Sequence, residues 1–261
     1  MRRSYIGTGN PNYGKHHSLE TRLAISYSHK GILDRVFCAE DSNRFEHLRT
    51  DEIITGLMLS DGYLTDCSKG HSMFRLDQSL EHKELVFATA RHFHTLGFRV
   101  RIRLRERFYK GKVLKNIYIW TNANGVLTHL RNYWYPDGIK RPPKSLVLTP
   151  RTLAYWFMGD GCSGRTNQGR SVTIHLATHG FTQTENEYLK QLLHTTGFFS
   201  ASIIHYHGFY IQIARADDVK RFMHEIVPHI LADFKYKIKL PLLFCERGQP
   251  QRKMLTQEKL F

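Results

Sequence analysis

The pattern of apolar residues predicts two helices that end in the same way. In residues 50–62 and again in residues 149–161, apolar side chains recur three and four positions apart, and each series closes on an aspartate. This spacing is typical of one face of an α-helix. Thr50 and Thr149 suit the N-cap, and the glycine after each aspartate is expected to form a left-handed C-terminal cap. Each helix should have about three turns.

Alternating apolar and polar residues predict β-strands between and after these helices. The expected strands cover residues 71–79, 99–109, 113–123, 171–178, 200–206 and 209–214. Gly111 is expected to turn the chain between the second and third strands, and His207 with Gly208 between the last two. A helix-like spacing separates the first two strands.

The chain repeats itself at a shift of about one hundred residues. Asp61 and Asp160 are 99 positions apart, and the sequence HTLGF at residues 94–98 returns as HTTGF at residues 194–198. An internal repeat of this kind predicts two halves of the same architecture. Each half reads as a helix, a set of strands and a further helix.

The repeat also predicts the organisation of the whole chain. We expect a first half at residues 45–145 and a second half at residues 146–245. An arm at residues 1–32 should precede them, and a tail at residues 246–261 should follow.

The two aspartates stand in places that are unfavourable for a structural role. Each extends an apolar stripe, where burying an ionised carboxylate is costly, and each lies at a helix C-terminus, the unfavourable end for negative charge. The small residues Gly56 and Ala154 would let the two helices pack closely and bring the carboxylates together. Two negative charges held close together repel each other, so this arrangement indicates a divalent metal site.

The sequences ITGLMLSDG at residues 54–62 and LAYWFMGDG at residues 153–161 resemble the two motifs of the LAGLIDADG homing endonucleases. The resemblance covers roughly residues 45–245 and is to the single-chain, two-motif form. It implies a pseudo-symmetric α+β fold of αββαββα-like halves. Two motif helices would lie at the centre, with two saddle-shaped antiparallel sheets that bind DNA.

The resemblance implies roles for individual residues. In that family the last acid of each motif binds Mg²⁺ at a scissile phosphate, which assigns Asp61 and Asp160 as metal ligands. A basic residue stands near each metal, and Lys140 and Lys239, also 99 positions apart, match those positions, with Lys237 as a rival for Lys239. Such a lysine could stabilise charge on the phosphorane or position the attacking water.

Composition and one strand point independently to nucleic acid. The chain has 38 Lys and Arg against 23 Asp and Glu, a formal charge of +15 that favours a polyanionic partner. In residues 99–107 every second residue is arginine, which places Arg99, Arg101, Arg103, Arg105 and Arg107 on one face of a strand. Val100, Ile102 and Leu104 should then face the core. Further expected DNA contacts are Arg75, Lys115, His175, His205 and Gln212.

The N-terminal segment carries a second resemblance. Residues 9–31, GNPNYGKHHSLETRLAISYSHKG, are similar to the modular DNA-binding segment attached to several homing endonucleases. The turn-rich start and the helix-favouring residues 21–30 fit an extended arm and a short helix that follow a groove, with Lys15 as an expected contact.

The remaining features concern location and partners. The four cysteines form no CxxC pair, which indicates a reducing, intracellular compartment, and no run of residues is apolar enough for a membrane span. The family resemblance implies a mitochondrion or chloroplast. The expected partner is double-stranded DNA with a long target site, bound by a monomer.

The resulting interpretation is an intron-encoded, Mg²⁺-dependent endonuclease that cuts both strands of a specific DNA site and leaves short 3′ overhangs. Two alternatives stay open at this point. The same fold serves RNA maturases that bind intron RNA and assist splicing, and a DNA-binding regulator could have lost its chemistry.

Overall fold

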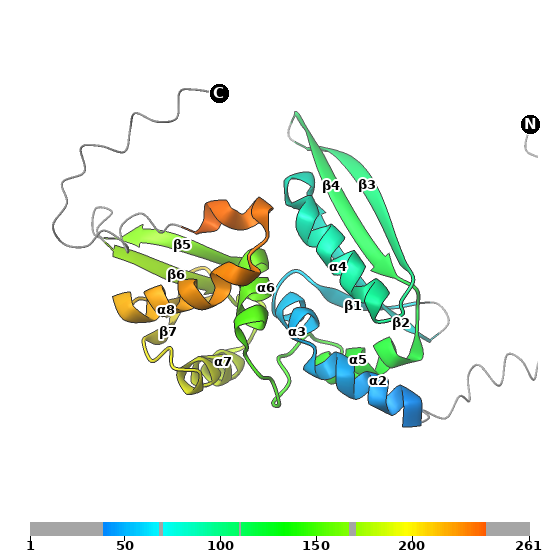
Figure 1. Ribbon diagram of the computed structural model, residues 1–261, viewed down its shortest axis with the longest axis horizontal. Coiled ribbons are helices and arrows are strands. Elements are labelled where there is room, and N and C mark those ends of the chain that lie inside the picture. Colours follow the sequence, from blue (N-terminus) through cyan, green and yellow to red (C-terminus); the bar gives the residue numbers. More distant parts are fainter. Residues whose placement is uncertain (1–38, 68–69, 110, 167–170, 239–261) are drawn as a thin grey trace, which may run out of the picture. The chain divides into compact units, whose positions relative to one another are not determined.

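The computed structural model describes residues 39–67, 70–109, 111–166 and 171–238 (Figure 1). The chain separates into two units, Met1–Asn43 and Arg44–Phe261, and the second unit contains both copies of the repeat. Helix α2 (Ala39–Thr50) crosses this boundary, and its Leu48 joins the core of the second unit. In the described part of the chain, no helix has the length and apolarity needed to cross a bilayer.

The two halves have the same order of elements, helix, two strands, helix, two strands and helix, which confirms the predicted α+β repeat. The first half consists of α3 (Glu52–Leu59), β1 (Tyr63–Asp66), β2 (Ser72–Ser79), α4 (Lys83–Thr95), β3 (Val100–Tyr109), β4 (Lys112–Thr121) and α5 (Gly125–Trp134). The second consists of α6 (Pro150–Asp160), β5 (Gly161–Thr166), β6 (Ser171–Ala177), α7 (Gln183–Thr195), β7 (Ala201–His205), β8 (Phe209–Ile213) and α8 (Ala216–Ile226). Short 3₁₀ helices are η2 (Leu80–His82), η3 (Val227–His229) and η4 (Ala232–Lys237).

Each half builds one antiparallel sheet of four strands with the same topology. The strand order is β1-β2-β4-β3 in the first sheet and β5-β6-β8-β7 in the second. The six strands expected from alternation are confirmed, and Gly111, His207 and Gly208 have the positive φ angles that their turns require. The sequence analysis missed β1 and β5, which are short and lack a clear alternation of apolar and polar residues.

Helices cover one face of each sheet and leave the other face open. In the first sheet α4 and α5 pack on the strands, and in the second α7 and α8 do so (Figure 1). As predicted, Ile102 and Leu104 share the inner face of the sheet with their buried ladder partners Ile119 and Ile117, but they are not buried themselves, because they are 40% and 67% exposed. Ile102 lies beside α4, where it lines an open hollow with Phe87 and Arg91, and the end of the β3–β4 hairpin extends beyond α4 (Figure 1).

The motif helices α3 and α6 pack directly against each other (Figure 1). A Cβ atom on Gly56 would lie 2.6 Å from the carbonyl oxygen of Thr152 and 2.6 Å from Cβ of Tyr155, so the contact requires glycine at this position. This confirms Gly56 as a point of close approach. A second point is Gly159, where a Cβ would lie 2.5 Å from Oγ of Ser60.

The helix caps differ from the prediction in part. Thr149 caps α6 as expected, with Pro150 in its first turn, but Asp51 rather than Thr50 caps α3 by accepting a 2.9 Å hydrogen bond from Ile54 N. Thr50 ends the preceding helix α2 instead. The prediction of left-handed glycine caps is wrong as well. Gly161 has φ −94°, and glycine is needed there because a Cβ would lie 2.6 Å from Cα of Phe157.

Candidate active site

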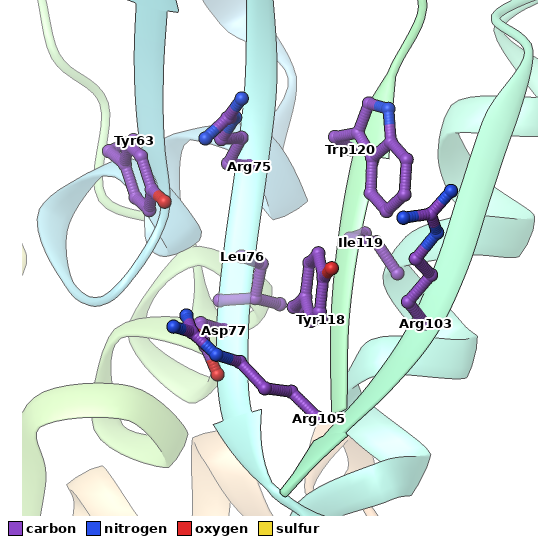
Figure 2. Close-up of a pocket in the computed structure, with 9 residues that line it drawn as sticks. All are labelled: Tyr63, Arg75, Leu76, Asp77, Arg103, Arg105, Tyr118, Ile119 and Trp120. Carbon is purple, nitrogen blue, oxygen red and sulfur yellow. The ribbon is translucent and has the colours of Figure 1, made fainter. Parts of the chain in front are cut away.

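The open face of the first sheet carries arginines among aromatic rings. A hollow of about 380 Å³ on this face is lined by Tyr63, Arg75, Leu76, Asp77, Arg103, Arg105, Tyr118, Ile119 and Trp120 (Figure 2). Tyr118 and Trp120 stack with their ring centroids 5.4 Å apart, and the guanidinium of Arg103 lies 5.3 Å from the Trp120 centroid. The hollow therefore combines positive charge with flat rings, which suits phosphates and bases.

The predicted alternation of arginines on β3 is present in the structure. Arg101 pairs with Trp120 across the ladder, as Arg75 does from the other side, so the two arginines flank the same ring on one face. Arg99, just before β3, is exposed. On β4, Nζ of Lys115 lies 3.4 Å from Oε1 of Glu106 on β3. Arg107 belongs to β3, but its side chain lies outside the described part, as does Lys15.

The second sheet presents a different open face. Its strands β6, β7 and β8 contain no lysine or arginine. His175 and Gln212 lie side by side, with Nε2 of each 3.0 Å apart, and burial lowers the pKa of His175. His205 is exposed at the end of β7, but its ladder partner Phe209 shares a face with the buried Ile211, so the register places His205 on the opposite face from His175. On these three strands the open face therefore presents hydrogen-bonding side chains, whereas the first sheet presents arginines.

The two motif aspartates meet where α3 and α6 end. Asp61 follows α3 and is exposed, whereas Asp160 is the last residue of α6 and is half-buried. A Cβ on Gly159 would lie 3.1 Å from Oδ2 of Asp61, so the residue before Asp160 touches the Asp61 carboxylate. The packing of the helices therefore brings the two acids together, as the sequence predicted.

Electrostatics at this point are unfavourable for two carboxylates without a cation. Burial, and after it the negative charge of Asp61, raises the pKa of Asp160 to about 6, although Lys140 and Lys237 act in the opposite direction. The pKa of Asp160 is raised because its carboxylate has little water around it and a second negative charge nearby. A bound cation would attract the ionised carboxylate and offset both effects.

Lys140 lies at the C-terminal end of the first motif helix. Its Nζ donates hydrogen bonds to the carbonyl oxygens of Ser60 at 2.8 Å and Gly62 at 2.7 Å, on either side of Asp61. Burial lowers the pKa of Lys140 to about 8, while the negative charges of Asp160 and Asp61 oppose this shift. The ammonium group also satisfies carbonyls that a helix end leaves without partners.

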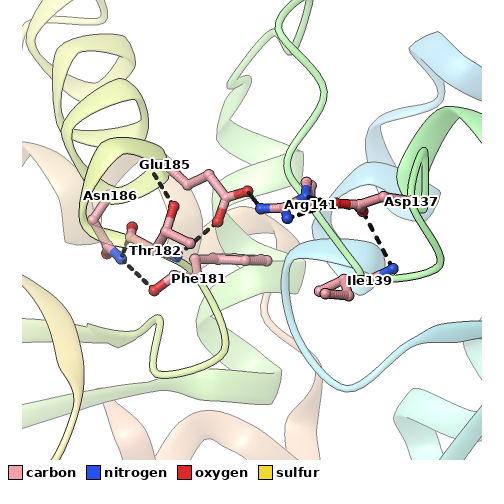
Figure 3. Close-up of polar contacts among 7 residues, drawn as sticks. All are labelled: Asp137, Ile139, Arg141, Phe181, Thr182, Glu185 and Asn186. Atoms are coloured by element: carbon pink, nitrogen blue, oxygen red, sulfur yellow. Dashed lines mark hydrogen bonds and ion pairs between the residues drawn. The ribbon is translucent and has the colours of Figure 1, made fainter.

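The backbone that carries Lys140 is fixed by the next residue along the chain. Arg141 donates to Oδ2 of Asp137 at 2.7 Å and to Oε1 of Glu185 at 2.8 Å (Figure 3). Glu185 also forms the capping box of α7 with Thr182 (Figure 3). Arg141 thus ties the segment between the halves to the start of a helix in the second half.

In the second half the equivalent position belongs to Lys237. Its Nζ donates to the carbonyl oxygens of Met158 at 2.7 Å and Gly159 at 3.1 Å, at the end of α6. Burial lowers its pKa, against the attraction of Asp61 and Asp160. Lys239, which the repeat interval of 99 predicted, lies outside the described residues. Of the two candidates, the structure describes Lys237 and places it at the end of α6.

Gln78 is a site residue that the sequence analysis missed. Its Nε2 donates a 2.6 Å hydrogen bond to Oδ2 of Asp61. The signal was present, because Gln78 is a polar residue in the buried, apolar series of β2 that includes Phe74 and Leu76. The residue 100 positions later, Thr178, donates to Asn186 instead. The two halves therefore differ in how they hold their aspartates.

Comparison with known families agrees with this geometry. The model of the LAGLIDADG DNA endonuclease family matches residues 51–222, and that of the NUMOD3 motif matches residues 1–26. An uncharacterized protein of Methanocaldococcus jannaschii is 31% identical over 205 residues, which cover 76% of this chain and 75% of that protein. A probable intron-encoded DNA endonuclease of Mycosarcoma maydis is 35% identical over 88 residues, which cover 33% of this chain and 60% of that protein.

Among solved structures, the homing endonuclease I-WcaI bound to its DNA recognition sequence has a similar fold. The match has a TM-score of 0.62 at 23% identity and covers 80% of this chain and 96% of that one. At this level of identity the likeness concerns the fold, in which two similar halves meet at a pair of helices.

Proposed function

Because the chain belongs to the LAGLIDADG DNA endonuclease family, we propose that it is a monomeric, Mg²⁺-dependent endonuclease that cuts both strands of a long, specific DNA site. The observation that carries this proposal is the meeting of Asp61 and Asp160 at the ends of two packed helices, each end bound by a half-buried lysine. Paired carboxylates beside ammonium groups are suited to phosphodiester hydrolysis.

The residues present fit a divalent cation. Carboxylate oxygens are the ligands that Mg²⁺ prefers, and the raised pKa of Asp160 indicates that negative charge is in excess there. Among the described residues there is no cluster of three His, Cys, Asp or Glu side chains that could enclose a metal. This agrees with Mg²⁺ sites that use one or two carboxylates and fill the remaining positions with water and substrate phosphate.

The protein's own groups have distinct parts in the proposed reaction. Asp61 and Asp160 would hold the metal, which when bound lowers the pKa of the attacking water and offsets charge on the phosphate. Lys140 and Lys237 would place positive charge beside the phosphate and keep the two helix ends in position. Gln78 would orient the Asp61 carboxylate.

The open sheet faces would hold the DNA. On the first face, arginines would contact phosphates and guanine edges, with Trp120 and Tyr118 as flat surfaces between them. On the second face, His175 and Gln212 would contact base edges by hydrogen bonds. The arm at residues 1–32 would bind flanking DNA. The family resemblance supports short 3′ overhangs and an intron-encoded origin.

A cleavage selection tests this proposal. The purified protein is incubated with a randomised double-stranded DNA library and Mg²⁺, and cleaved ends are sequenced. We expect one long target, cut on both strands, with cleavage abolished by a chelator and DNA bound without cleavage when Ca²⁺ replaces Mg²⁺. Cleavage that persists in a chelator would contradict the metal assignment. Failure to cut any target, with rescue of splicing of an intron RNA, would favour the maturase alternative.

A further inference from the structure

A chain of hydrogen bonds leads from Asp61 away from the proposed metal site to a residue near the end of the described chain. Gln78 contacts Asp61 through Nε2, and its Oε1 lies 3.4 Å from Nδ1 of His82. His82 in turn places Nε2 at 3.1 Å from the hydroxyl of Tyr236. Asp61, which follows α3, and three side chains from β2, η2 and η4 therefore form one continuous series.

The direction of every bond in this series follows from its first member. An ionised carboxylate can only accept hydrogen bonds, so Gln78 must turn its NH₂ group toward Asp61 and its oxygen toward His82. Nδ1 of His82 must then carry a proton and donate it to that oxygen. In the neutral ring Nε2 is left as an acceptor, and the Tyr236 hydroxyl is the donor that satisfies it.

The ring of His82 is held in this orientation by aromatic contacts. It stacks on Phe234 with centroids 4.5 Å apart and an interplanar angle of 29°, and it lies nearly parallel to Tyr236 at 6.0 Å. Both aromatic residues belong to η4, which is also fixed to α4. Asp233 accepts a 2.8 Å bond from Glu84 N, and its own N donates to the Glu84 carboxylate at 3.3 Å.

We propose that His82 is a positioning residue for Asp61, acting through Gln78 with a proton on Nδ1. Groups that orient a metal ligand in this way commonly matter nearly as much as the ligand itself. The effect of His82 on cleavage rests on the proposed endonuclease function, but the hydrogen bonds of His82 can be tested without any cleavage. Because Thr178 replaces Gln78 in the second half, this support is specific to the first half.

The first test measures the tautomer directly. Two-bond ¹H–¹⁵N correlation spectra of the ¹⁵N-labelled full-length protein at pH 8 report which nitrogen of each neutral histidine carries the proton. The His82 signals are identified by their loss in His82→Asn. We expect the Nδ1–H form in the wild-type protein and its loss in Gln78→Leu. A wild-type ring protonated on Nε2 would overturn the inference, whatever the protein does to DNA.

The second test separates positioning from stacking. His82→Phe keeps a ring against Phe234 but removes both hydrogen bonds, whereas His82→Asn loses the ring but places an amide NH₂ near the position of Nδ1. If His82 positions Asp61, His82→Phe should raise the Mg²⁺ concentration for half-maximal cleavage by about tenfold or more, and His82→Asn should recover most of this loss. Binding of target DNA in Ca²⁺ should stay within about twofold of wild type in both.

A matched control is His94→Phe, which changes an exposed histidine on the following helix, α4, and should leave the Mg²⁺ dependence unchanged. The opposite ranking, with His82→Phe like wild type and His82→Asn defective, would show that only stacking matters and would overturn the inference. Lack of cleavage by the wild-type protein would overturn the proposed function instead, while the tautomer would still decide the geometry of His82.

Discussion

Lys140 and Lys237 occupy equivalent positions in the two halves, because each donates hydrogen bonds from Nζ to the backbone carbonyls at the end of a motif helix. The interval from aspartate to lysine is 79 residues in the first half and 77 in the second. Among the described residues, equal contacts with a helix end identify Lys237 as the counterpart of Lys140, although the two intervals differ by two residues. Lys239 lies outside the described residues.

This equivalence predicts the effect of removing either lysine. Lys140→Met and Lys237→Met should each lower the single-turnover cleavage rate by about tenfold or more at saturating DNA and Mg²⁺, because each removes positive charge beside the reacting phosphate. Lys239→Met is the matched control and should change the rate little. A damaging Lys239→Met with a neutral Lys237→Met would restore the interval of 99 as the correct guide.

Neutralising one motif aspartate should separate binding from chemistry. We expect Asp61→Asn or Asp160→Asn to abolish double-strand cleavage while specific DNA binding in Ca²⁺ persists, because the amide retains the shape of the side chain but loses its charge. Gel-shift and cleavage assays on the selected target measure both properties. Full double-strand cleavage by either variant would remove that residue from the metal site.

The raised pKa of Asp160 predicts a gain in stability on its neutralisation. Its folded pKa is about 6 against an ordinary value of 3.8, so the folded protein binds this proton more tightly than the unfolded chain. Ionisation above pH 6 therefore costs stability. In metal-free buffer at pH 8, Asp160→Asn should increase the free energy of unfolding by on the order of 1–2 kcal/mol, after allowance for partial solvent exposure.

Denaturant unfolding across pH tests this expectation. The advantage of Asp160→Asn should shrink as the pH falls from 6 toward 4 and vanish below the pKa of the unfolded chain. Saturating Mg²⁺ should stabilise the wild-type protein more than the variant, because the variant lacks one charged ligand. If Asp160→Asn is less stable than wild type at pH 8 without metal, the prediction that the ionised Asp160 carboxylate destabilises the folded protein is wrong.

The arginines of the first sheet should carry most of the salt-dependent affinity. Substituting Arg101, Arg103 or Arg105 by alanine should cost roughly 1–3 kcal/mol wherever the side chain reads a base, with relaxed specificity at that base. A uniform loss with a flatter salt dependence would identify a phosphate contact. Gln212→Ala, which removes a neutral side chain from the second sheet, should leave the salt slope unchanged. If none of the three substitutions changes DNA affinity, this face of the sheet does not contact DNA.

The N-terminal arm should be separable from the chemistry. Deleting residues 1–32 should weaken DNA affinity and shorten the protected footprint on one side, because a tethered second module raises effective concentration. Cleavage at saturating protein should survive. Footprinting and cleavage by full-length and truncated protein, both checked for folding, measure this. An unchanged footprint at equal affinity would reduce the arm to a basic tail.

Much of the fold was readable from local sequence because its signals are periodic. Apolar spacing identified α6, alternation identified six strands, and the repeat identified two halves with Asp61 and Asp160 as equivalent ends of paired helices. These features depend on which side of a helix or strand a residue occupies, and the sequence order alone determines that.

Only the tertiary structure decided how residues from distant segments meet. Lys237 is the last residue of the 3₁₀ helix η4 and contacts the end of α6, although it is 77 rather than 79 residues from its aspartate. Gln78 contacts Asp61 because β2 passes the end of α3. Ile102 and Leu104 alternate like core residues and share a face with the buried Ile119 and Ile117, yet they are 40% and 67% exposed. Periodicity fixes the direction of a side chain, but the packing of other elements determines what that side chain contacts.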